Sequence, residues 1–591
     1  MMRTSALLAL CLFMLAVSNP LAAENAYLVR NLVSDIPDLA DHTDPNLVGA
    51  WGISESGSSP FWISDAGKGV TTLYDSSGDV IALVVGIPAS KAGGSAGVPT
   101  GTVWNGTTGF QVGSGEAAAF LFDSLDGAIS GWNPTADRAH TIIMVDNSSA
   151  GAEYTGLAIG TINSNSYLYA ANFHAGTIEV YSSTFEQMTF TNGFKDPLIP
   201  AGYAPFNIQN LGGKLYVAYA QQNAGQNFAN SGPGLGYVDV FDTGGNLLRH
   251  LVAGGWLNAP WGLAIAPAGF GDFAGDVLVG NFGDGTINVF NPSTGAYVAT
   301  LMDPIGAPIV IPNLWALQPG NGGSGGDANA VYFTAGIPGP DNGNHGLFGR
   351  LQAAPGVVTA GVTSLAGASV AIAPGTWISI KGANLAETTR VWNNGDFVNG
   401  ALPTEIDGVS VRINGDPAYV YSVSPAQLVV LTSTDLAAPG TATLTTNNNG
   451  LVSGNATIQV QALAPAFFTS SDGKHVAAVH ADGSGVGPAG TNGVSPAKPG
   501  ETISLYGSGF GATNPAIPDG KLVTTPLPLV TPPAIMIGGT AVQPWFAGLS
   551  GPGEYQFTVT VPATAADGDV PVSAQLGALT TQANLVIAVH H

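Results

Sequence analysis

The chain has 591 residues, of which only 9% are charged, and 39 acidic residues against 15 basic residues give it a net charge of −24. This acidic balance argues against nucleic acids and anionic membrane surfaces as partners. With 82 glycines and 40 prolines, the composition indicates a turn-rich, all-β protein, and the length indicates more than one domain.

The N-terminal segment 1–23 has the pattern of a cleavable secretory signal. A basic residue precedes an apolar run over residues 6–17, and small residues follow, so we expect cleavage after Ala23. The apolar run is shorter than the roughly 20 residues that a membrane-spanning helix needs, and no later segment reaches that length. The single cysteine, Cys11, lies inside this segment, so the mature chain forms no disulfide. We therefore expect an exported protein without a membrane span, located in the periplasm, at the cell surface or outside the cell.

Residues 24–352 repeat a leading apolar strand that is followed by a Gly-rich turn and further short strands. The clearest copy occupies residues 260–264 and continues at residues 280–290. Equivalent leading strands lie at Trp51, Thr100, Gly156, Phe206, Trp261 and Trp315. A period of about 50 residues fits one four-stranded blade per repeat. The sequence therefore predicts a six-bladed β-propeller.

The sixth blade shows only three strands, at residues 314–318, 330–334 and 346–351. The apolar segment at residues 26–33, AYLVRNLV, can supply the fourth strand from the mature N-terminus. Pairing of this segment with the last blade would close the ring and remove two exposed sheet edges.

After a linker at residues 352–355 the pattern changes. The phrase PGTWISIKGANL at residues 374–385 returns as PGETISLYGSGF at residues 499–510. Two tandem modules of short alternating strands, at residues 356–463 and 464–591, are typical of immunoglobulin-like sandwiches. The predicted fold class is all-β, with a six-bladed β-propeller followed by two immunoglobulin-like β-sandwich domains.

These phrases carry two family resemblances. Residues 24–352 resemble an uncharacterised family of secreted bacterial NHL-like six-bladed β-propeller proteins, through WGI, YAANFH, PAGYAPFNIQ, LVGNFGDG and HGLFG. Residues 356–591 resemble the TIG-like, immunoglobulin-fold modules of large secreted bacterial proteins, through their Pro-Gly phrases. Neither resemblance implies a catalytic residue.

Propeller topology places candidate site residues on one face of the disc. The loop before the innermost strand and the turn between the second and third strands lie on the same face of a blade. The polar residues predicted there, around the central channel, are His42, Asp65, Asn172, His174, Asn281, Asp284 and His345. Their carboxylates, amides and imidazoles can bind a sugar or a divalent metal ion, or act in acid–base chemistry.

His174, His345 and Asp65 are the candidate metal ligands, since imidazole suits a transition metal and neither turn requires a histidine. The alternative is structural, because Asp and Asn are ordinary turn formers. The recurring aromatics Trp51, Phe206, Trp261 and Trp315 also allow two interpretations, as stacking platforms for a sugar or as packing between neighbouring blades. Equivalent positions in every repeat favour packing.

The modular layout favours a secreted or cell-surface-associated binding protein. In this hypothesis the propeller face recognises a glycan or an extracellular protein, and the C-terminal modules act as spacers or docking units. Two alternatives remain. One is a propeller enzyme, such as a metal-assisted lactonase or other hydrolase, or a lyase, that uses the His and Asp residues of the channel face. The other is a structural envelope protein, because one fold carries unrelated functions.

Overall fold

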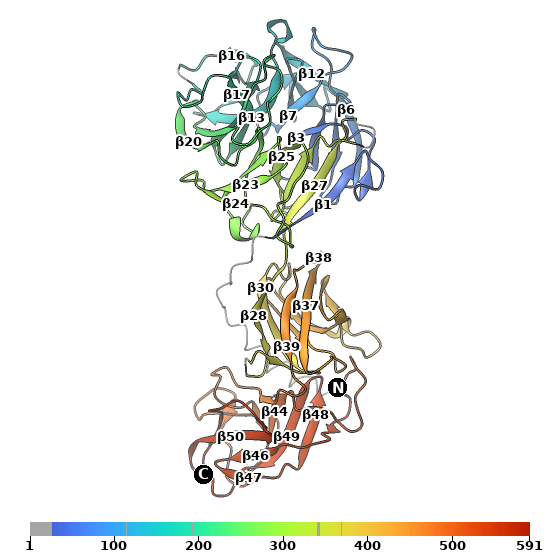
Figure 1. Cartoon of the computed structure of the whole chain (residues 1–591), viewed down its shortest axis with the longest axis vertical. Coiled ribbons are helices and arrows are strands. Elements are labelled where there is room, and N and C mark those ends of the chain that lie inside the picture. Colours follow the sequence, from blue (N-terminus) through green and yellow to red (C-terminus); the bar gives the residue numbers. More distant parts are fainter. Residues whose placement is uncertain (1–25, 114, 192, 340–342, 368) are drawn as a thin grey trace. The chain divides into compact units, whose positions relative to one another are not determined.

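The computed structural model describes residues 26–591 except 114, 192, 340–342 and 368. The described residues up to Ala353 form one compact unit, and Ala354–His591 belong to a second (Figure 1). The signal segment predicted at residues 1–23 lies outside the described residues. None of the helices in the described part of the chain has the length and apolar character needed to cross a membrane.

The first unit is a six-bladed β-propeller, and within its described residues each blade is built on four strands. Blade 1 contains β3 (Ala50–Ser54), β4 (Phe61–Asp65), β5 (Val70–Tyr74) and β6 (Val80–Gly86). Blade 2 contains β7 (Pro99–Trp104), β10 (Phe120–Ser124), β11 (Ala128–Asn133) and β12 (Asp137–Asp146), with an added hairpin of β8 (Gln111–Val112) and β9 (Glu116–Ala117). Blade 3 contains β13 (Tyr154–Ile162), β14 (Asn165–Asn172), β15 (Thr177–Ser182) and β16 (Gln187–Met188).

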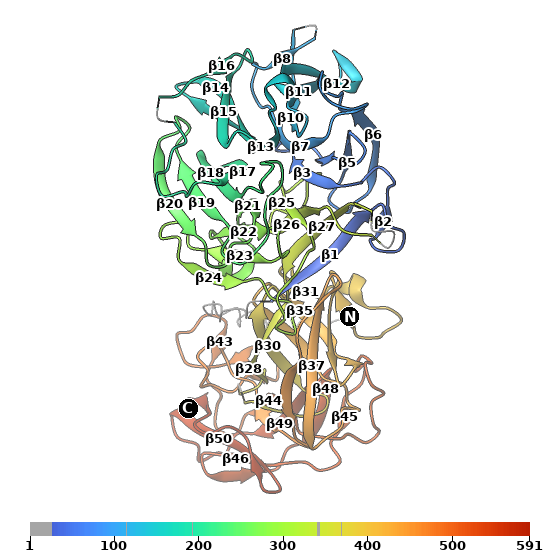
Figure 2. The ribbon, with the colours of Figure 1, turned by 45° about the horizontal axis from the view of Figure 1, so that its top comes forward.

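Blade 4 contains β17 (Tyr203–Leu211), β18 (Lys214–Gln221), β19 (Tyr237–Phe241) and β20 (Leu247–Ala253). Blade 5 contains β21 (Pro260–Ile265), β22 (Val277–Asn281), β23 (Ile287–Phe290) and β24 (Tyr297–Thr300). Blade 6 contains β25 (Leu314–Pro319), β26 (Val331–Ala335), β27 (Leu347–Ala353) and β1 (Tyr27–Ser34), and β2 (His42–Thr43) extends it. The first strands of the six blades, β3, β7, β13, β17, β21 and β25, surround the centre of the ring (Figure 2).

The N-terminal strand β1 closes the ring, as the sequence predicts. It pairs antiparallel with β27, from Tyr27 opposite Ala353 to Ser34 opposite Leu347. Val33 is fully buried, and the Tyr27 hydroxyl donates a hydrogen bond of 2.8 Å to the Phe270 carbonyl of blade 5. The last blade is therefore made from both ends of the propeller sequence.

Aromatic side chains fill the space between the innermost strands. The rings of Trp51 and Trp315 stack with centroids 3.7 Å apart, and Phe206 and Trp261 lie 5.7 and 5.9 Å from Trp315. Trp261 Nε1 donates to the Thr155 carbonyl of blade 3 at 2.8 Å. The sequence favours packing between neighbouring blades at these positions. The structure shows that the packing also joins blades that are not neighbours, because all six leading strands converge on the centre.

The second unit contains two immunoglobulin-like sandwiches. The main strands of the first are β28 (Gly356–Ser364), β30 (Trp377–Ala383), β33 (Val409–Ile413), β35 (Tyr419–Val423), β36 (Gln427–Leu431), β37 (Gly440–Asn448) and β39 (Ala456–Val460). Those of the second are β41 (Ala478–His480), β44 (Thr502–Ser508), β46 (Ala534–Ile537), β47 (Thr540–Val542), β48 (Phe546–Gly551), β49 (Glu554–Thr560), β50 (Gly568–Leu576) and β52 (Val586–Val589). Helical structure in the described residues is limited to three short 3₁₀ turns at Ser148–Ala150, Gly271–Phe273 and Asn394–Asp396.

Hydrogen bonds join the two sandwiches, which belong to one compact unit. Asp519 of the second sandwich accepts from the Tyr419 hydroxyl at 2.6 Å and from the Thr434 N–H at 2.7 Å, both in the first. Trp377 Nε1 donates to the Pro552 carbonyl at 2.7 Å. The bonds to the Asp519 carboxylate are charge-assisted, and hydrogen bonds of this kind are stronger than neutral ones.

Candidate functional site

The second strand of several blades carries a buried polar residue at its last or next-to-last position. The residues at this position in blades 1, 2, 3 and 5 are Asp65, Asp123, Asn172 and Asn281, each at most 3% exposed. Asp123 Oδ1 accepts the Gly101 N–H at 2.6 Å, and Asn281 Oδ1 accepts the Asn258 N–H at 3.1 Å. In blades 3 and 5 the side chain holds the loop that precedes the innermost strand, since Asn172 Oδ1 likewise accepts the Glu153 N–H at 3.3 Å. In blade 2 Asp123 holds the innermost strand β7 itself, and in blade 1 Asp65 accepts the Thr72 hydroxyl of β5 at 2.8 Å. The predicted residues Asp65, Asn172 and Asn281 are therefore buried hydrogen-bonding groups of their blades.

Two of these positions carry carboxyl groups where other blades carry amides. Asp65 Oδ1 and Asp123 Oδ2 have no hydrogen-bond partner among the described residues. Burial raises the pKa of Asp123 to about 7 and the pKa of Asp65 well above its ordinary value. Both carboxyl groups therefore hold a proton more tightly in the folded protein than an exposed carboxyl group does.

We expect Asp123→Asn to flatten the pH dependence of propeller stability. Because the pKa of Asp123 rises on folding from 3.8 to about 7, the folded state holds the proton more tightly, and the free energy of unfolding falls as the pH rises through that interval. The amide keeps an oxygen for the Gly101 N–H and does not ionise. Denaturant unfolding between pH 4 and 8 measures the difference from the unsubstituted chain. Asp38→Asn, at an exposed aspartate, is the control. Parallel curves for the two variants would contradict the expectation.

The closure between blades 6 and 1 gathers a histidine and three carboxylates. His345 Nδ1 lies 2.7 Å from Asp35 Oδ2, and the His345 side chain is 18% exposed. Asp44 Oδ2 accepts the Tyr74 hydroxyl at 2.9 Å. Asp44 and Asp35 both add to the rise in the pKa of Asp65, behind burial as the main cause, so their charges lie within electrostatic reach of it. A carboxylate on Nδ1 fixes the orientation of an imidazole, as in acid–base sites.

The structure corrects the prediction for His42. This residue lies on β2, the outermost strand of the blade 6 sheet, opposite Val33 of β1. Its Nε2 is 3.7 Å from Asp79 Oδ1 of blade 1. Because β2 extends the sheet outward from the closing strand, His42 lies at the rim of the disc rather than beside the channel.

His174 lies in the turn after β14, in blade 3. Its Nδ1 is buried without a hydrogen-bond partner among the described residues, and its charge acts on Glu153, whose pKa is raised by burial. The predicted metal ligands His174, His345 and Asp65 thus belong to three blades. Among the described residues, the structure brings a different set of three to within ligand distance, namely Asp196, Asp239 and His250 of blade 4 and the loop before it. Sequence reasoning missed this set.

Asn281 and Asp284 belong to a hydrogen-bond network that holds an exposed aromatic pair. Asn281 Nδ2 donates to the Trp256 carbonyl at 2.9 Å, and Asn258 Nδ2 donates to Asp284 Oδ2 at 3.0 Å. The Trp256 side chain is 57% exposed and stacks on Tyr297 with centroids 4.5 Å apart and an interplanar angle of 13°. The exposed carboxylate of Asp284 is thus fixed by the loop that presents the Trp256 ring.

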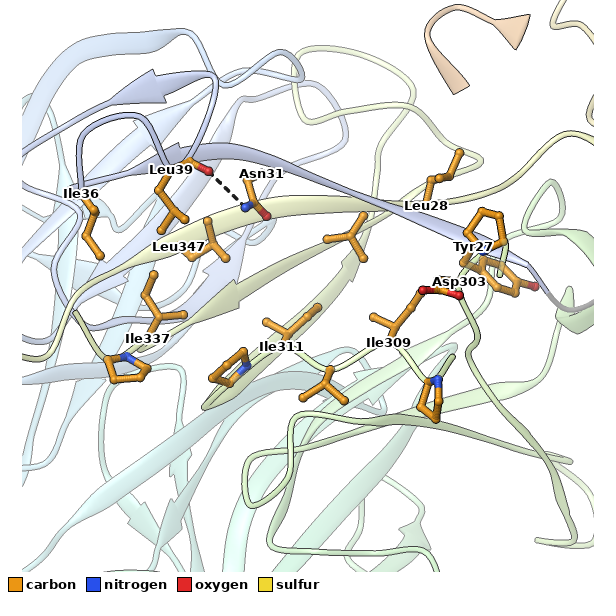
Figure 3. A pocket seen from close by; sticks show the side chains of 16 residues that line it. Tyr27, Leu28, Asn31, Ile36, Leu39, Asp303, Ile309, Ile311, Ile337 and Leu347 are labelled. Carbon is orange, nitrogen blue, oxygen red and sulfur yellow. Dashed lines mark hydrogen bonds between the residues drawn. The ribbon is translucent and has the colours of Figure 1, made fainter. Parts of the chain in front are cut away.

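An apolar pocket of about 700 Å³ lies between the closing strand and the loop that follows β24 (Figure 3). Its wall includes Tyr27, Leu28, Ile309, Ile311 and Leu347. Polar groups are few, and the dashed line of Figure 3 marks the bond from Asn31 Nδ2 to the Leu39 carbonyl at 3.2 Å. None of the site residues predicted from the sequence lines this pocket.

Several known proteins are similar to parts of this chain. The IPT/TIG domain family matches residues 362–460. The "Uncharacterized protein R648" of Acanthamoeba polyphaga mimivirus is 31% identical over 341 residues, which cover 56% of this chain and 82% of R648. The "Uncharacterized protein L690" of the same virus is 32% identical over 342 residues, which cover 56% of this chain and 87% of L690.

Among solved structures, the virginiamycin B lyase of Staphylococcus aureus aligns with 55% of this chain and 98% of its own, at 10% identity and a TM-score of 0.31. A likeness this weak carries no argument about activity. Identity and coverage with the two viral proteins are high enough to define a relationship. This chain belongs to the protein family that includes R648 and L690 of Acanthamoeba polyphaga mimivirus.

Proposed function

We propose that this protein is a binding protein whose propeller recognises a glycan at blade 5. The observation that carries the proposal is the exposed stack of Trp256 and Tyr297, in which Trp256 belongs to the loop whose Asn258 side chain holds the Asp284 carboxylate. The two sandwiches would serve as a rigid spacer or docking block, since the Asp519 hydrogen bonds hold them together.

The chemistry of this site matches a sugar. Two stacked and exposed aromatic rings offer a ligand a broad apolar face, and Trp and Tyr combine an apolar face with a polar edge. The Asp284 carboxylate accepts the Asn258 amide on Oδ2 and the Thr286 hydroxyl and N–H on Oδ1. A carboxylate has about four acceptor positions, so a ligand hydroxyl can still bind. An aromatic face with a preorganised acceptor at its side fits the apolar face and hydroxyl rim of a pyranose.

Trp256→Ala is expected to weaken glycan binding about tenfold or more while leaving the fold intact, because hot-spot aromatics contribute about 2 kcal/mol or more to an interface. Glycans retained by the intact chain on an array would be measured by calorimetry against both proteins. Trp545→Ala, at a tryptophan 80% exposed in the second unit, is the matched control and should bind like the intact chain. Equal loss in both variants, or glycan binding unchanged by Trp256→Ala, would refute the site.

We further propose that the chain is exported and cleaved after Ala23, which the pattern of residues 1–23 supports. The N-terminal sequence of the mature protein tests this. A mature chain that begins at Glu24 is the expected result, and an intact Met1 in the exported fraction would exclude cleavage there.

A second candidate function is acid–base catalysis at the closure of the ring, as in a hydrolase or lyase. The pair of His345 and Asp35, 2.7 Å apart and partly exposed beside buried Asp65, favours it. Turnover of an ester or lactone that is lost in His345→Gln and retained in His174→Gln would support this candidate. Activity that survives His345→Gln would remove it.

A further inference from the structure

We propose that blade 4 carries a binding site for a divalent transition metal, formed by Asp196, Asp239 and His250. This site goes beyond glycan recognition, lies in another blade, and differs from the ligands predicted from the sequence.

The strand register builds two of the three ligands. Asp239 of β19 lies directly opposite His250 of β20 in the antiparallel ladder. Residues in register on adjacent strands project from the same face of the sheet, so the carboxylate and the imidazole meet there. Asp196 comes from the segment between β16 and β17 and reaches this face from the side of blade 3.

The three side chains converge on one nitrogen. His250 Nδ1 lies 2.6 Å from Asp196 Oδ2 and 2.9 Å from Asp239 Oδ1. The side chains of Asp196 and Asp239 are 1% and 0% exposed, and that of His250 is 21% exposed. Asp239 Oδ2 is also buried, and within the described residues it makes no hydrogen bond of good distance and angle, although the Tyr219 hydroxyl interacts with the Asp239 side chain. A fully buried carboxylate oxygen without such a partner is rare in a folded protein and calls for a ligand.

The charge of this cluster points to a divalent cation. Two buried carboxyl groups lie beside one imidazole, and a buried carboxylate without an opposite charge beside it is expensive. A divalent ion with a neutral imidazole balances both carboxylates. Tyr219 is a neighbour of this cluster, and its hydroxyl is neutral. Burial is the main cause of its raised pKa, and the charges of Asp239 and Asp196 and a hydrogen bond with Asp239 add to the rise.

The donor set and its spacing fit a borderline transition metal such as Zn²⁺. One imidazole nitrogen with carboxylate oxygens suits zinc or manganese, whereas calcium prefers oxygen alone. Metal–ligand bonds of about 2.1 Å in a tetrahedron separate neighbouring donor atoms by about 3.4 Å. The donor atoms here lie within 4.8 Å of one another, so side-chain shifts of about 0.5 Å open the centre for the ion.

The bound ion would fasten the segment that carries Asp196 to the outer strands of blade 4. Metal affinity would then appear as added stability of the folded state, because the unfolded chain has no such site. This gives the proposal a readout that is independent of any activity.

The test is calorimetric titration of the full chain with Zn²⁺, together with thermal unfolding with and without the metal. The expected result is one equivalent bound and a melting temperature that rises with Zn²⁺. Asp239→Asn, which keeps the shape of the side chain, should lower the affinity for Zn²⁺ about tenfold or more. Asp196→Asn should lower it by a similar factor, and it changes no residue of the β-sheet. Near-ultraviolet circular dichroism confirms that each variant is folded.

The C-terminal histidines provide the control for surface binding. His590 and His591 flank Asp567 at 3.5 and 2.8 Å and are well exposed. A His590→Ala/His591→Ala variant should keep the equivalent of Zn²⁺ and the thermal shift. The proposal is overturned if the intact chain binds no Zn²⁺, or if binding and shift persist in both aspartate variants. It is also overturned if the C-terminal variant alone abolishes them.

Discussion

Trp315→Ala is expected to destabilise the propeller by about 3–5 kcal/mol. The Trp315 ring is 7% exposed and stacks on Trp51 at 3.7 Å and on Phe282 at 4.3 Å. Removal of the indole leaves a cavity where the leading strands of several blades meet, and those strands cannot collapse into it without breaking their own sheets. Denaturant unfolding followed by tryptophan fluorescence measures the loss.

Trp256→Ala is the matched control, because Trp256 belongs to the same propeller but is 57% exposed. Substitutions at exposed sites usually change stability by less than about 0.5 kcal/mol, and the loss of the Tyr297 stack adds a fraction more. The two variants should therefore separate the roles of the aromatics. Trp315 stabilises the ring, whereas Trp256 serves the ligand. Equal destabilisation by both substitutions would contradict the assignment of the central aromatics to the core.

Val33→Asp is expected to cost at least about 4 kcal/mol and to open the ring. Val33 is fully buried in β1, between Phe348 of β27 and His42 of β2. A carboxylate at this position would be buried without a partner, and an unpaired buried charge is among the most destabilising substitutions in a protein core. Loss of the strand would leave β27 as an exposed sheet edge. Limited proteolysis and chemical unfolding both report the opening.

The same strand supplies its own control. Val29 is the same residue type in β1 but is 40% exposed, so Val29→Asp should change the free energy of unfolding by only about 0.5 kcal/mol. If the two aspartate variants were equally stable, β1 would not be essential for closure. The pairing of Tyr27–Ser34 with Leu347–Ala353 would then contribute little to the fold.

The propeller could be predicted from the sequence because its signals are local and repeated. A leading apolar strand and a Gly-rich turn recur once per blade. Because the last blade has one strand too few, residues 26–33 could be predicted to supply its fourth strand. The strand β2 carried no such signal, since two residues are too few to show a pattern. His42 was therefore expected on the channel face, whereas it lies on the outermost strand of the blade 6 sheet.

The candidate sites were less predictable, because they depend on register and exposure. Asp284 and Asn281 were found from their place in the turn of blade 5, but Trp256 lies outside the repeated positions and nothing in the sequence states that its ring is exposed. Asp239 and His250 had a weak signal. Asp239 is the charged residue in the apolar strand YVDVF, and His250 occupies a similar place in LLRHLVA. The sequence does not show that Asp239 pairs with His250 across two strands, or that Asp196 lies beside both of them, and these two facts define the cluster.

The closure by β1 also fixes an order of events during synthesis. The strand that begins the propeller is the first to leave the ribosome, and its partner β27 is the last strand of the propeller to be made. For the whole of that interval β1 must wait with its apolar residues unpaired, and the nascent blades keep an open edge. Such edges pair readily with other chains, so the period before closure is when this protein is most exposed to aggregation. We therefore expect aggregation before closure, rather than after it, to lower the yield of the folded chain.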